Sequence, residues 1–265
     1  MNRKRLVIGT VAATLALFAG LGVAASLAAE KITLNALVAS SSKPPYEELV
    51  ASFEKSHPGV TVETEFLGGG QIGKAIDDGK AADIVLVGSA ILAKESGLVE
   101  PVTPIYNTKD IVITPKKNPA KVKSLKDLAN PGVKISIGTP ASAVGAISAG
   151  ILQKAAADYG FDFIQKVHAN ITFQSEVGQE VVDAVSSGKA DAAIVFVTDG
   201  DTSKFDVYPI EDKYNTTSYY QGTVTKNAKN AKLGEEFVKL MASKAGQAVF
   251  AKHRYLPPTM PPAPK

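Results

Sequence analysis

Short apolar runs alternate with segments of helical periodicity along the chain after residue 30. Apolar runs, or strict apolar–polar alternation, predict strands at 34–38, 60–66, 82–87, 110–114, 133–137, 169–173, 191–197 and 218–225. Apolar residues three and four positions apart predict helices at 44–53, 71–78, 90–96, 124–129, 146–159, 174–187 and 233–252. This alternation is typical of an α/β fold whose strands are mainly parallel.

The alternation occurs twice, with prolines between the two halves. Pro104 and the segment 115–119 flank the strand at 110–114 and mark a crossing, and the chain returns near 218. We therefore predict a two-lobed clamshell in which each lobe is a mainly parallel sheet flanked by helices. Lobe 1 is expected to comprise 30–108 plus 218–265, and lobe 2 to comprise 109–217. Ligands of open parallel sheets bind beyond the carboxyl ends of the strands, so the cleft between the lobes is the expected site.

Small polar residues occupy the turn after the first strand. Ser40, Ser41 and Ser42 stand directly before Pro44 and Pro45, which suit a first helical turn. The start of a helix offers free backbone N–H groups and the positive end of the helix dipole, which favour an anion. Similar small-residue loops follow at 68–70, 138–145 and 174–178, so four such loops are expected around one point.

The N-terminal segment 1–29 has the pattern of a signal peptide. It is basic at Arg3, Lys4 and Arg5, apolar from 6 to 25, and ends in small residues. An uncleaved membrane anchor is the alternative, because the apolar run approaches spanning length. In either case the folded part is expected outside the cytoplasmic membrane, periplasmic or extracytoplasmic.

Charge and cysteine content exclude several classes of partner and site. The net charge of +3 is carried by the basic leader, so the remainder is balanced and gives no reason to expect nucleic acid. The chain has no cysteine, which excludes disulfides, thiolate metal sites and a lipid-modified N-terminal cysteine.

An enzyme is the alternative from a different class. Residues 68–73 match G-x-G-x-x-G between a strand and a helix, a dinucleotide-binding pattern. The next strand, however, ends in Val87, Gly88 and Ser89 and lacks the acid that holds a ribose. No G-x-S-x-G is present, and the three histidines have no metal-ligand spacing. We therefore predict no catalytic residue, no resident metal and no cofactor.

Four blocks of sequence carry a resemblance to a known family. ALVASSSKPPYEELVASF, GGGQIGKAIDDGKAADIVLVGS, NTKDIVITPKKN and ISIGTPASAVGAISAGILQKA follow one another in the chain. In order and spacing they resemble the periplasmic molybdate-binding proteins of ABC importers. The resemblance implies a type II binding protein that closes on a tetrahedral oxyanion and delivers it to a membrane permease, with the protein acting as a monomer.

The resemblance also implies a set of ligand contacts. The family's first serine falls on Ser41, and its second falls on Gly69, where only backbone N–H groups of Gly69 and Gly70 can donate. Its backbone donors fall near Gly145 and on Val177. Its tyrosine donor falls on Phe196, which has no hydroxyl. Ser42, Gln71, Ser142 and Ser175 are candidate replacements for the two absent side-chain donors. Ser41 and Ser142 are equally suited by position to cap a helix.

The donor chemistry narrows the ligand class. Neutral N–H and O–H donors favour an anion without a proton, since a protonated phosphate wants a carboxylate acceptor. Glu176 is the one acid in the four loops. Molybdate and tungstate are therefore expected first. Sulfate and a small organic anion remain alternatives, and the sequence does not choose between molybdate and tungstate.

Overall fold

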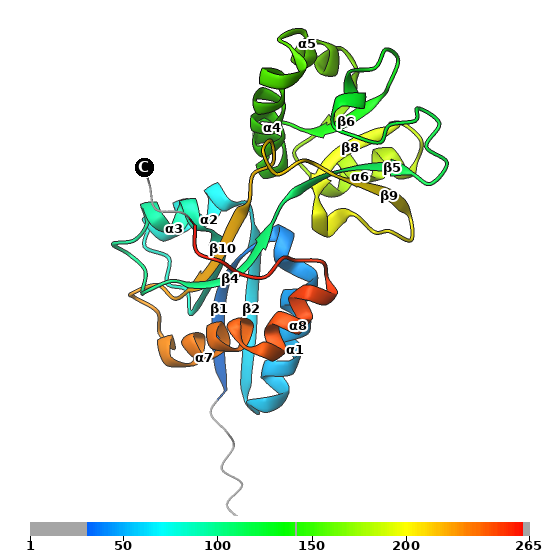
Figure 1. Cartoon of the computed structure of the whole chain (residues 1–265). Helices are drawn as coiled ribbons and strands as arrows, with labels where there is room; N and C mark the ends of the chain where they lie inside the picture. Colours follow the sequence, from blue (N-terminus) through cyan, green and yellow to red (C-terminus); the bar gives the residue numbers. More distant parts are fainter. Residues whose placement is uncertain (1–30, 141, 262–265) are drawn as a thin grey trace, which may run out of the picture. The chain divides into compact units, whose positions relative to one another are not determined.

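The computed structural model describes residues 31–140 and 142–261, and the predicted leader at 1–29 lies outside them. Two five-stranded sheets form the framework, with strand orders β2-β1-β3-β10-β4 and β7-β6-β8-β5-β9. Figure 1 shows the chain passing from the first sheet into the second along β4 and β5 and returning along β10.

The first lobe contains the first sheet and its helices. Its elements are β1 (Ile32–Ala39), α1 (Lys43–Ser56), β2 (Val60–Leu67), α2 (Gly69–Asp77), β3 (Ile84–Gly88), α3 (Ser89–Lys94), β4 (Thr103–Thr108), β10 (Ser218–Thr223), α7 (Ala231–Ala242) and α8 (Lys244–Lys252). A 3-10 turn at Ser40–Ser42 joins β1 to α1. Pro44 and Pro45 lie in the first turn of α1, as their missing N–H groups predicted.

The second lobe contains the second sheet. Its elements are β5 (Asp110–Pro115), β6 (Ile135–Gly138), α4 (Ala143–Tyr159), α5 (Asp162–Ala169), β7 (Ile171–Ser175), α6 (Gly178–Ser186), β8 (Ala192–Phe196) and β9 (Phe205–Pro209), with 3-10 turns at Lys126–Ala129 and Val197–Asp199. Strands β4 and β10 belong to the first sheet and β5 and β9 to the second. The lobe boundaries at 108/109 and 217/218 remain predictions.

Each sheet is mixed but mainly parallel, as expected, because four of its five strands run in one direction and one runs in reverse. In the first, β1 pairs in parallel with β2 and β3, whereas β10 is antiparallel to β3 and β4. In the second, β6 is parallel to β7 and β8, whereas β5 is antiparallel to β8 and β9. In each sheet the reversed strand is the one along which the chain enters from the other sheet, β5 in the second sheet and β10 in the first.

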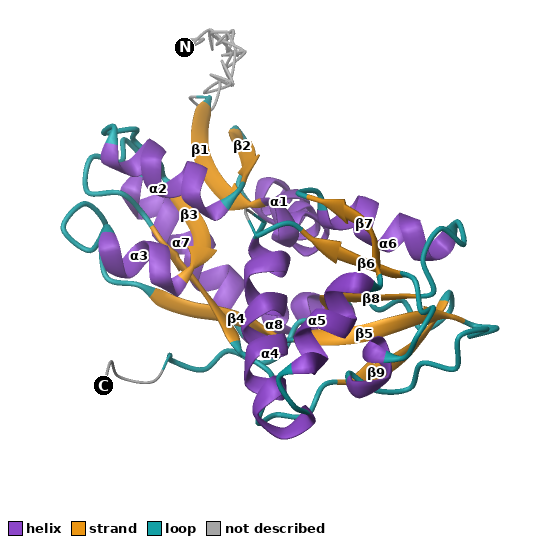
Figure 2. Ribbon diagram, turned by 90° about the horizontal axis from the view of Figure 1, so that it is seen from above, coloured by secondary structure: helices purple, strands orange, loops and turns teal. Residues whose placement is uncertain are grey.

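Strand alternation divides the core of the second lobe between the two faces of its sheet. Val112 of β5 and Ile194 of β8 face one side, with α4 and α5, while Ile111 and Val195 face the other, with α6. Figure 2 shows these helices around the second sheet. Successive strand residues point to opposite faces, so a strand covered on both sides is apolar throughout. That pattern made β8 visible in the sequence.

Several predicted elements were wrong in detail. The single helix expected at 233–252 is two helices, because Ser243 ends α7 and its side chain accepts the N–H of Gly246 to begin α8. The strand expected at 169–173 lies at Ile171–Ser175, preceded by α5, which the prediction omitted. Helix α2 begins at Gly69, two residues before the expected start, so the glycine-rich loop is largely a helical turn.

Two acids that precede strands at equivalent places in the two lobes have structural roles. Asp83 is 1% exposed and accepts the N–H groups of Asn35 (3.0 Å) and Asn230 (2.6 Å). Asp191 accepts the N–H of Lys134 (2.9 Å). Asp83 thereby joins β1, β3 and the segment before α7.

The described residues also bear on membrane insertion. Within 31–140 and 142–261, no helix is both long enough and apolar enough to cross a bilayer.

Asp83→Ala should lower the free energy of unfolding more than Asp191→Ala. It removes two backbone hydrogen bonds to a charged acceptor at a buried site, at about 1.5–3 kcal/mol each. Asp191 is half-buried and accepts one such bond from a backbone N–H, so its loss should cost about half as much. Urea denaturation of both variants measures the difference. Equal losses would show that burial of Asp83 adds nothing.

Candidate anion-binding site

Parallel strand pairing places helix N-termini side by side in both lobes. Ala39 at the end of β1 is paired with Leu67 at the end of β2, and α1 and α2 begin shortly after these residues. In the second lobe Gly138 is paired with Ser175, and α4 and α6 begin after them. Each lobe therefore presents two adjacent helix N-termini at one edge of its sheet, an arrangement that favours an anion.

Ser41 and Ser42 have different environments although they are neighbours. Ser42 is fully buried, and its hydroxyl is 2.6 Å from the phenol oxygen of Tyr106. Ser41 is exposed, and its carbonyl oxygen accepts the phenol O–H of Tyr255. No side chain caps α1. Of the two hydroxyls, that of Ser41 is therefore the one open to a ligand.

Gly69 and Gly70 form the first turn of α2. The Oε1 atom of Gln71 accepts the N–H of Gly68 at 2.9 Å, so the Gln71 side chain already has a capping role. A Cβ atom at Gly69 would meet only ordinary contacts with Ile91 and Val87, 3.5 and 3.7 Å away. Space therefore does not explain why a side chain is absent at Gly69.

Ser142 is the N-cap of α4. Its hydroxyl accepts the N–H of Gly145 (3.1 Å) and donates to the carbonyl oxygen of Thr139 (2.9 Å). Of the two roles considered for Ser142, the structure shows the cap. Gly145 is buried, and a Cβ atom there would lie 2.0 Å from the Thr139 oxygen. Only glycine lets α4 approach this loop so closely.

Val177 precedes α6 and is half-exposed, at 53%. Its N–H donates to the hydroxyl of Ser175 (3.0 Å), which in turn donates to the carboxylate of Glu180 (2.6 Å). The expected backbone donors at Gly145 and Val177 are thus both occupied by serine side chains. Glu176, the acid expected in this loop, is exposed.

Phe196 ends β8 and is 7% exposed. Its cross-strand partner in β5 is Asp110, so their side chains stand on the same face of the sheet. Asp110 is 1% exposed and was missed as a site residue, because the sequence shows it only as the first residue of an apolar strand. The one sign in the sequence was that a charged residue, Asp110, is the first residue of an otherwise apolar strand.

The hydrogen bonds around Asp110 indicate a neutral carboxylic acid. Its N–H and C=O bind the side-chain amide of Asn215, so neither stabilises the carboxylate. The Ser148 hydroxyl lies 3.3 Å from Oδ2 but has its better acceptor in the Val144 carbonyl, at 2.7 Å. Oδ1 has no partner among the described residues. Burial raises the pKa of Asp110 to about 8, against the lowering effect of the Ser148 hydroxyl and with a further rise from the charge of Asp199.

A cluster of phenols and one acid adjoins Ser41. Tyr106 stacks on Tyr220 (4.5 Å between centroids) and meets Tyr255 edge-on. Burial raises the pKa of Asp199 to about 6, against the opposing effects of the Phe196 backbone and Arg254. Because these residues come from β4, β10, the turn after β8 and the C-terminal segment, local sequence patterns gave no sign of the cluster.

Within residues 31–140 and 142–261, no three His, Asp or Glu side chains are placed to hold a metal ion together.

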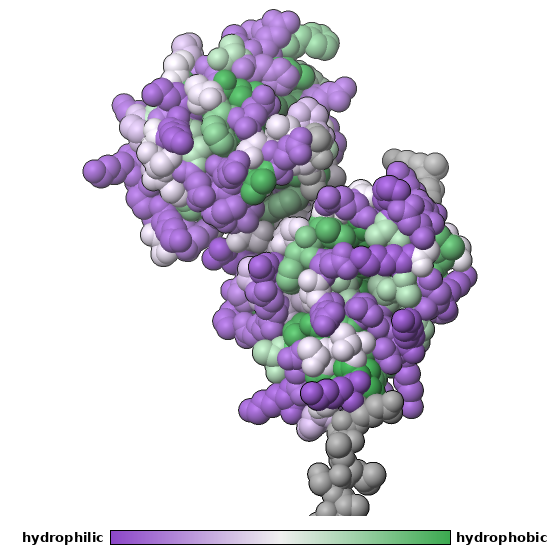
Figure 3. Space-filling view, turned by 180° about the vertical axis from the view of Figure 1, so that it is seen from behind, coloured by the Kyte–Doolittle hydropathy of each residue, from purple (hydrophilic) through white to green (hydrophobic). Residues whose placement is uncertain are grey.

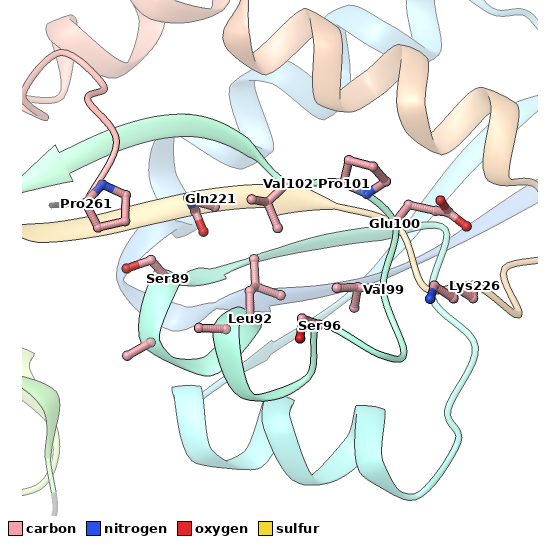
Figure 4. A pocket seen from close by; sticks show the side chains of 12 residues that line it. Ser89, Leu92, Ser96, Val99, Glu100, Pro101, Val102, Gln221, Lys226 and Pro261 are labelled. Atoms are coloured by element: carbon pink, nitrogen blue, oxygen red, sulfur yellow. The ribbon is translucent and has the colours of Figure 1, made fainter. Parts of the chain in front are cut away.

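A surface pocket of about 740 Å³ lies elsewhere on the first lobe. Figure 4 shows Leu92 of α3 and Val102 pointing toward one another across it, with Glu100 and Lys226 at one end. None of the predicted ligand contacts lines this pocket, and its mostly apolar walls suit no small anion.

Large apolar side chains are exposed at few places in the described chain. They are Leu98, Phe161, Val177 and Met260, and Val177 alone belongs to a predicted site loop. Hydrophilic groups cover much of the face in Figure 3, with apolar groups between them.

Comparison with known proteins agrees with this arrangement. Residues 34–256 match the family described as bacterial extracellular solute-binding protein. A Bacillus subtilis protein named as a candidate ABC transporter substrate-binding lipoprotein, YvgL, is 28% identical over 239 residues, covering 85% of this chain and 87% of that protein. The molybdate-binding protein ModA of Mycobacterium tuberculosis is 22% identical over 226 residues, covering 83% of each.

Solved structures show the same fold. The substrate-binding domain of a molybdenum ABC transporter from Clostridium difficile superposes with a TM-score of 0.69 at 21% identity, covering 85% of this chain and 98% of that chain. The sulfate-binding protein SubI of Mycobacterium tuberculosis gives a TM-score of 0.71 at 17% identity, covering 85% and 87%. The predicted two-lobed α/β fold is thereby confirmed.

Asp110→Asn should stabilise the protein increasingly as pH rises from about 4 to about 8. The folded pKa of Asp110, about 8, exceeds its ordinary value of 3.8, so the folded state holds a proton that the unfolded state releases. Stability contributed by this group therefore falls across that window, by on the order of a few kcal/mol in total, and levels off above it. Asparagine has no proton to lose.

Urea unfolding of both proteins between pH 4 and 9 measures this effect. Asp212→Asn is the matched control, because Asp212 is 86% exposed and pairs with Lys109. A stability difference between Asp110→Asn and the parent that stays constant from pH 4 to pH 8 would show that the folded state holds Asp110 ionised.

Proposed function

Because this chain belongs to the family of bacterial extracellular solute-binding proteins, we propose that it serves an ABC importer by binding a tetrahedral oxyanion, molybdate or tungstate, between its two lobes. Proteins of this family bind solutes without chemical conversion and carry no cofactor, so the chain is not an enzyme. The observation that carries the proposal is the pair of adjacent helix N-termini in each lobe.

Partners and location follow from the same proposal. A binding protein of this class delivers its anion to a membrane permease, and we infer that the chain does so as a monomer outside the cytoplasmic membrane. YvgL is named a lipoprotein, but this chain has no cysteine to carry a lipid. The leader would therefore act as a cleaved signal peptide or as a retained anchor.

The first lobe supports the choice of an oxyanion. The hydroxyl of Ser41 and the N–H groups of Gly69 and Gly70 are neutral donors; no side chain caps α1, and at α2 the Gln71 side chain binds only the N–H of Gly68. Such donors bind a fully ionised oxygen without requiring an acceptor on the protein. Sulfate is the second candidate, favoured by the similarity to the sulfate-binding protein SubI. Neither pocket chemistry nor the residues near Gly68 favour a nucleotide.

Molybdate or tungstate should raise the melting temperature of the mature protein and bind with one site per chain. Thermal shift followed by calorimetry, with molybdate, tungstate, sulfate and phosphate, tests this directly. Stabilisation by a bound ligand grows with its concentration over Kd, at about 2.7 kcal/mol for a hundredfold excess. NAD and a small organic acid are the negative controls. A response to either of these and to no oxyanion would overturn the proposal.

Ser41→Ala should weaken oxyanion binding by about 10- to 150-fold while leaving the ligand-free melting temperature unchanged. A hydrogen bond to a charged acceptor is worth about 1.5–3 kcal/mol, and Ser41 is exposed and caps no helix in the structure.

Ser42→Ala is the matched control for Ser41. Its hydroxyl is buried against Tyr106, so this change should lower stability and spare affinity. The reverse pattern, in which Ser41→Ala loses stability and keeps affinity, would make Ser41 a structural residue. Calorimetry and thermal unfolding of both variants separate the two roles.

A further inference from the structure

The C-terminal segment after α8 contacts loops of both lobes at the proposed site. Leu256 exchanges two backbone hydrogen bonds with Asn107 of β4, both 2.9 Å, which fix the segment. Tyr255 donates to the carbonyl oxygen of Ser41. Arg254 Nη2 donates to the carbonyl oxygen of Thr198 (2.8 Å), two residues after Phe196. Figure 1 shows this segment in red, running from α8 across β4.

Arg254 holds an unusual backbone conformation. Its φ of 66° lies in the left-handed region, directly after His253 ends α8. Glycine is the usual residue at this position of a helix end, and any other residue costs roughly 1–2 kcal/mol there. A side chain is thus present where the backbone favours its absence, and such an outlier is grounds for a functional hypothesis.

Arg254 is also the one arginine of the chain beyond residue 5, and it is exposed. Among the described residues it forms no ion pair, although Asp199 and Asp201 are close enough for its charge to lower their pKa values. One of its five N–H donors binds Thr198. The others are available, and a guanidinium matches two oxygens of an oxyanion at once.

We propose that Arg254 is a ligand-binding residue of the anion site, a cationic donor brought between the Ser41 turn and the turn after β8 by the C-terminal segment. This inference rests on the proposed function. The N–H groups of Gly145 and Val177 are already bound by Ser142 and Ser175, so the second lobe supplies little else to an anion through them. A guanidinium beside Asp199 also offsets the repulsion between that carboxylate and a dianion.

Calorimetric titration with molybdate, sulfate and phosphate tests the proposal on the mature parent protein and three variants. Arg254→Gly removes the donor at a position where glycine relieves the backbone, so the variant should melt at or above the parent temperature. Its affinity should fall by about 10- to 150-fold, the factor for a charge-assisted hydrogen bond. Arg254→Lys keeps the charge but not the paired donors, so its loss should be intermediate.

Lys252→Ala is the control for charge alone. Lys252 lies two residues away and pairs with Glu48 (2.9 Å). Because water and salt screen an exposed charge, removal of Lys252 should change the affinity for the anion less than about twofold. Affinity of Arg254→Gly equal to or above that of the parent would show that Arg254 merely fastens the two turns. If Arg254→Gly melts at a lower temperature than the parent, the test falls to Arg254→Lys, provided that this variant melts at the parent temperature. An anion affinity of Arg254→Lys equal to that of the parent then overturns the proposal.

The two proposals fail in distinguishable ways. A parent protein that binds none of the three anions removes the proposed function and this inference with it. A parent that binds one of them, together with an Arg254→Gly protein that binds it equally well, removes the inference alone.

Discussion

Backbone N–H groups in the first turn of a helix have no partner within the helix, and this constraint organises both lobes. In the second lobe the Ser142 side chain caps α4, and the Ser175 side chain binds the N–H of Val177 before α6. At the site end of the first lobe no side chain caps α1, and at α2 the Gln71 side chain binds only the N–H of Gly68. The two lobes therefore meet the same requirement differently. The donors left for an anion are concentrated on the first lobe.

Much of the fold was readable from the sequence because its central strands are covered on both faces. Strands β3 and β8 appear as unbroken apolar runs. Strand β4 was missed because Pro104 reads as a breaker, although the strand tolerates it beside the irregular pairing with β10. The break at Ser243 was missed because the apolar stripe continues across it. The spacing of apolar residues shows which face of a helix is buried, but it does not show where a capping residue ends one helix and begins the next.

Only part of the candidate site could be predicted from the sequence, because some of its residues are brought together by contacts between distant segments. Loop positions such as Ser41 and Gly69 follow from local patterns, since a strand, a turn and a helix are consecutive in the chain. Asp110, Asp199 and Arg254 lie near these loops only through pairing between segments far apart in sequence, such as Asp110 with Asn215 and Arg254 with Thr198. Glu176 was the only acid expected at the site, because a single sequence does not show which distant residues fold next to the four loops. Two further acids, Asp110 and Asp199, lie beside Phe196.

The position of β10 between β3 and β4 has a consequence for the order of folding. Strand β4 has no neighbour in the first sheet until β10 arrives, and β10 follows the whole of the second sheet in the chain. During synthesis the second sheet is complete once residue 209 has emerged, whereas the first must wait for residue 223 and for α7. The first lobe thus stays incomplete until nearly the entire polypeptide exists. The sheet that carries the Ser41 turn and the start of α2 is therefore the last part of the fold to be completed.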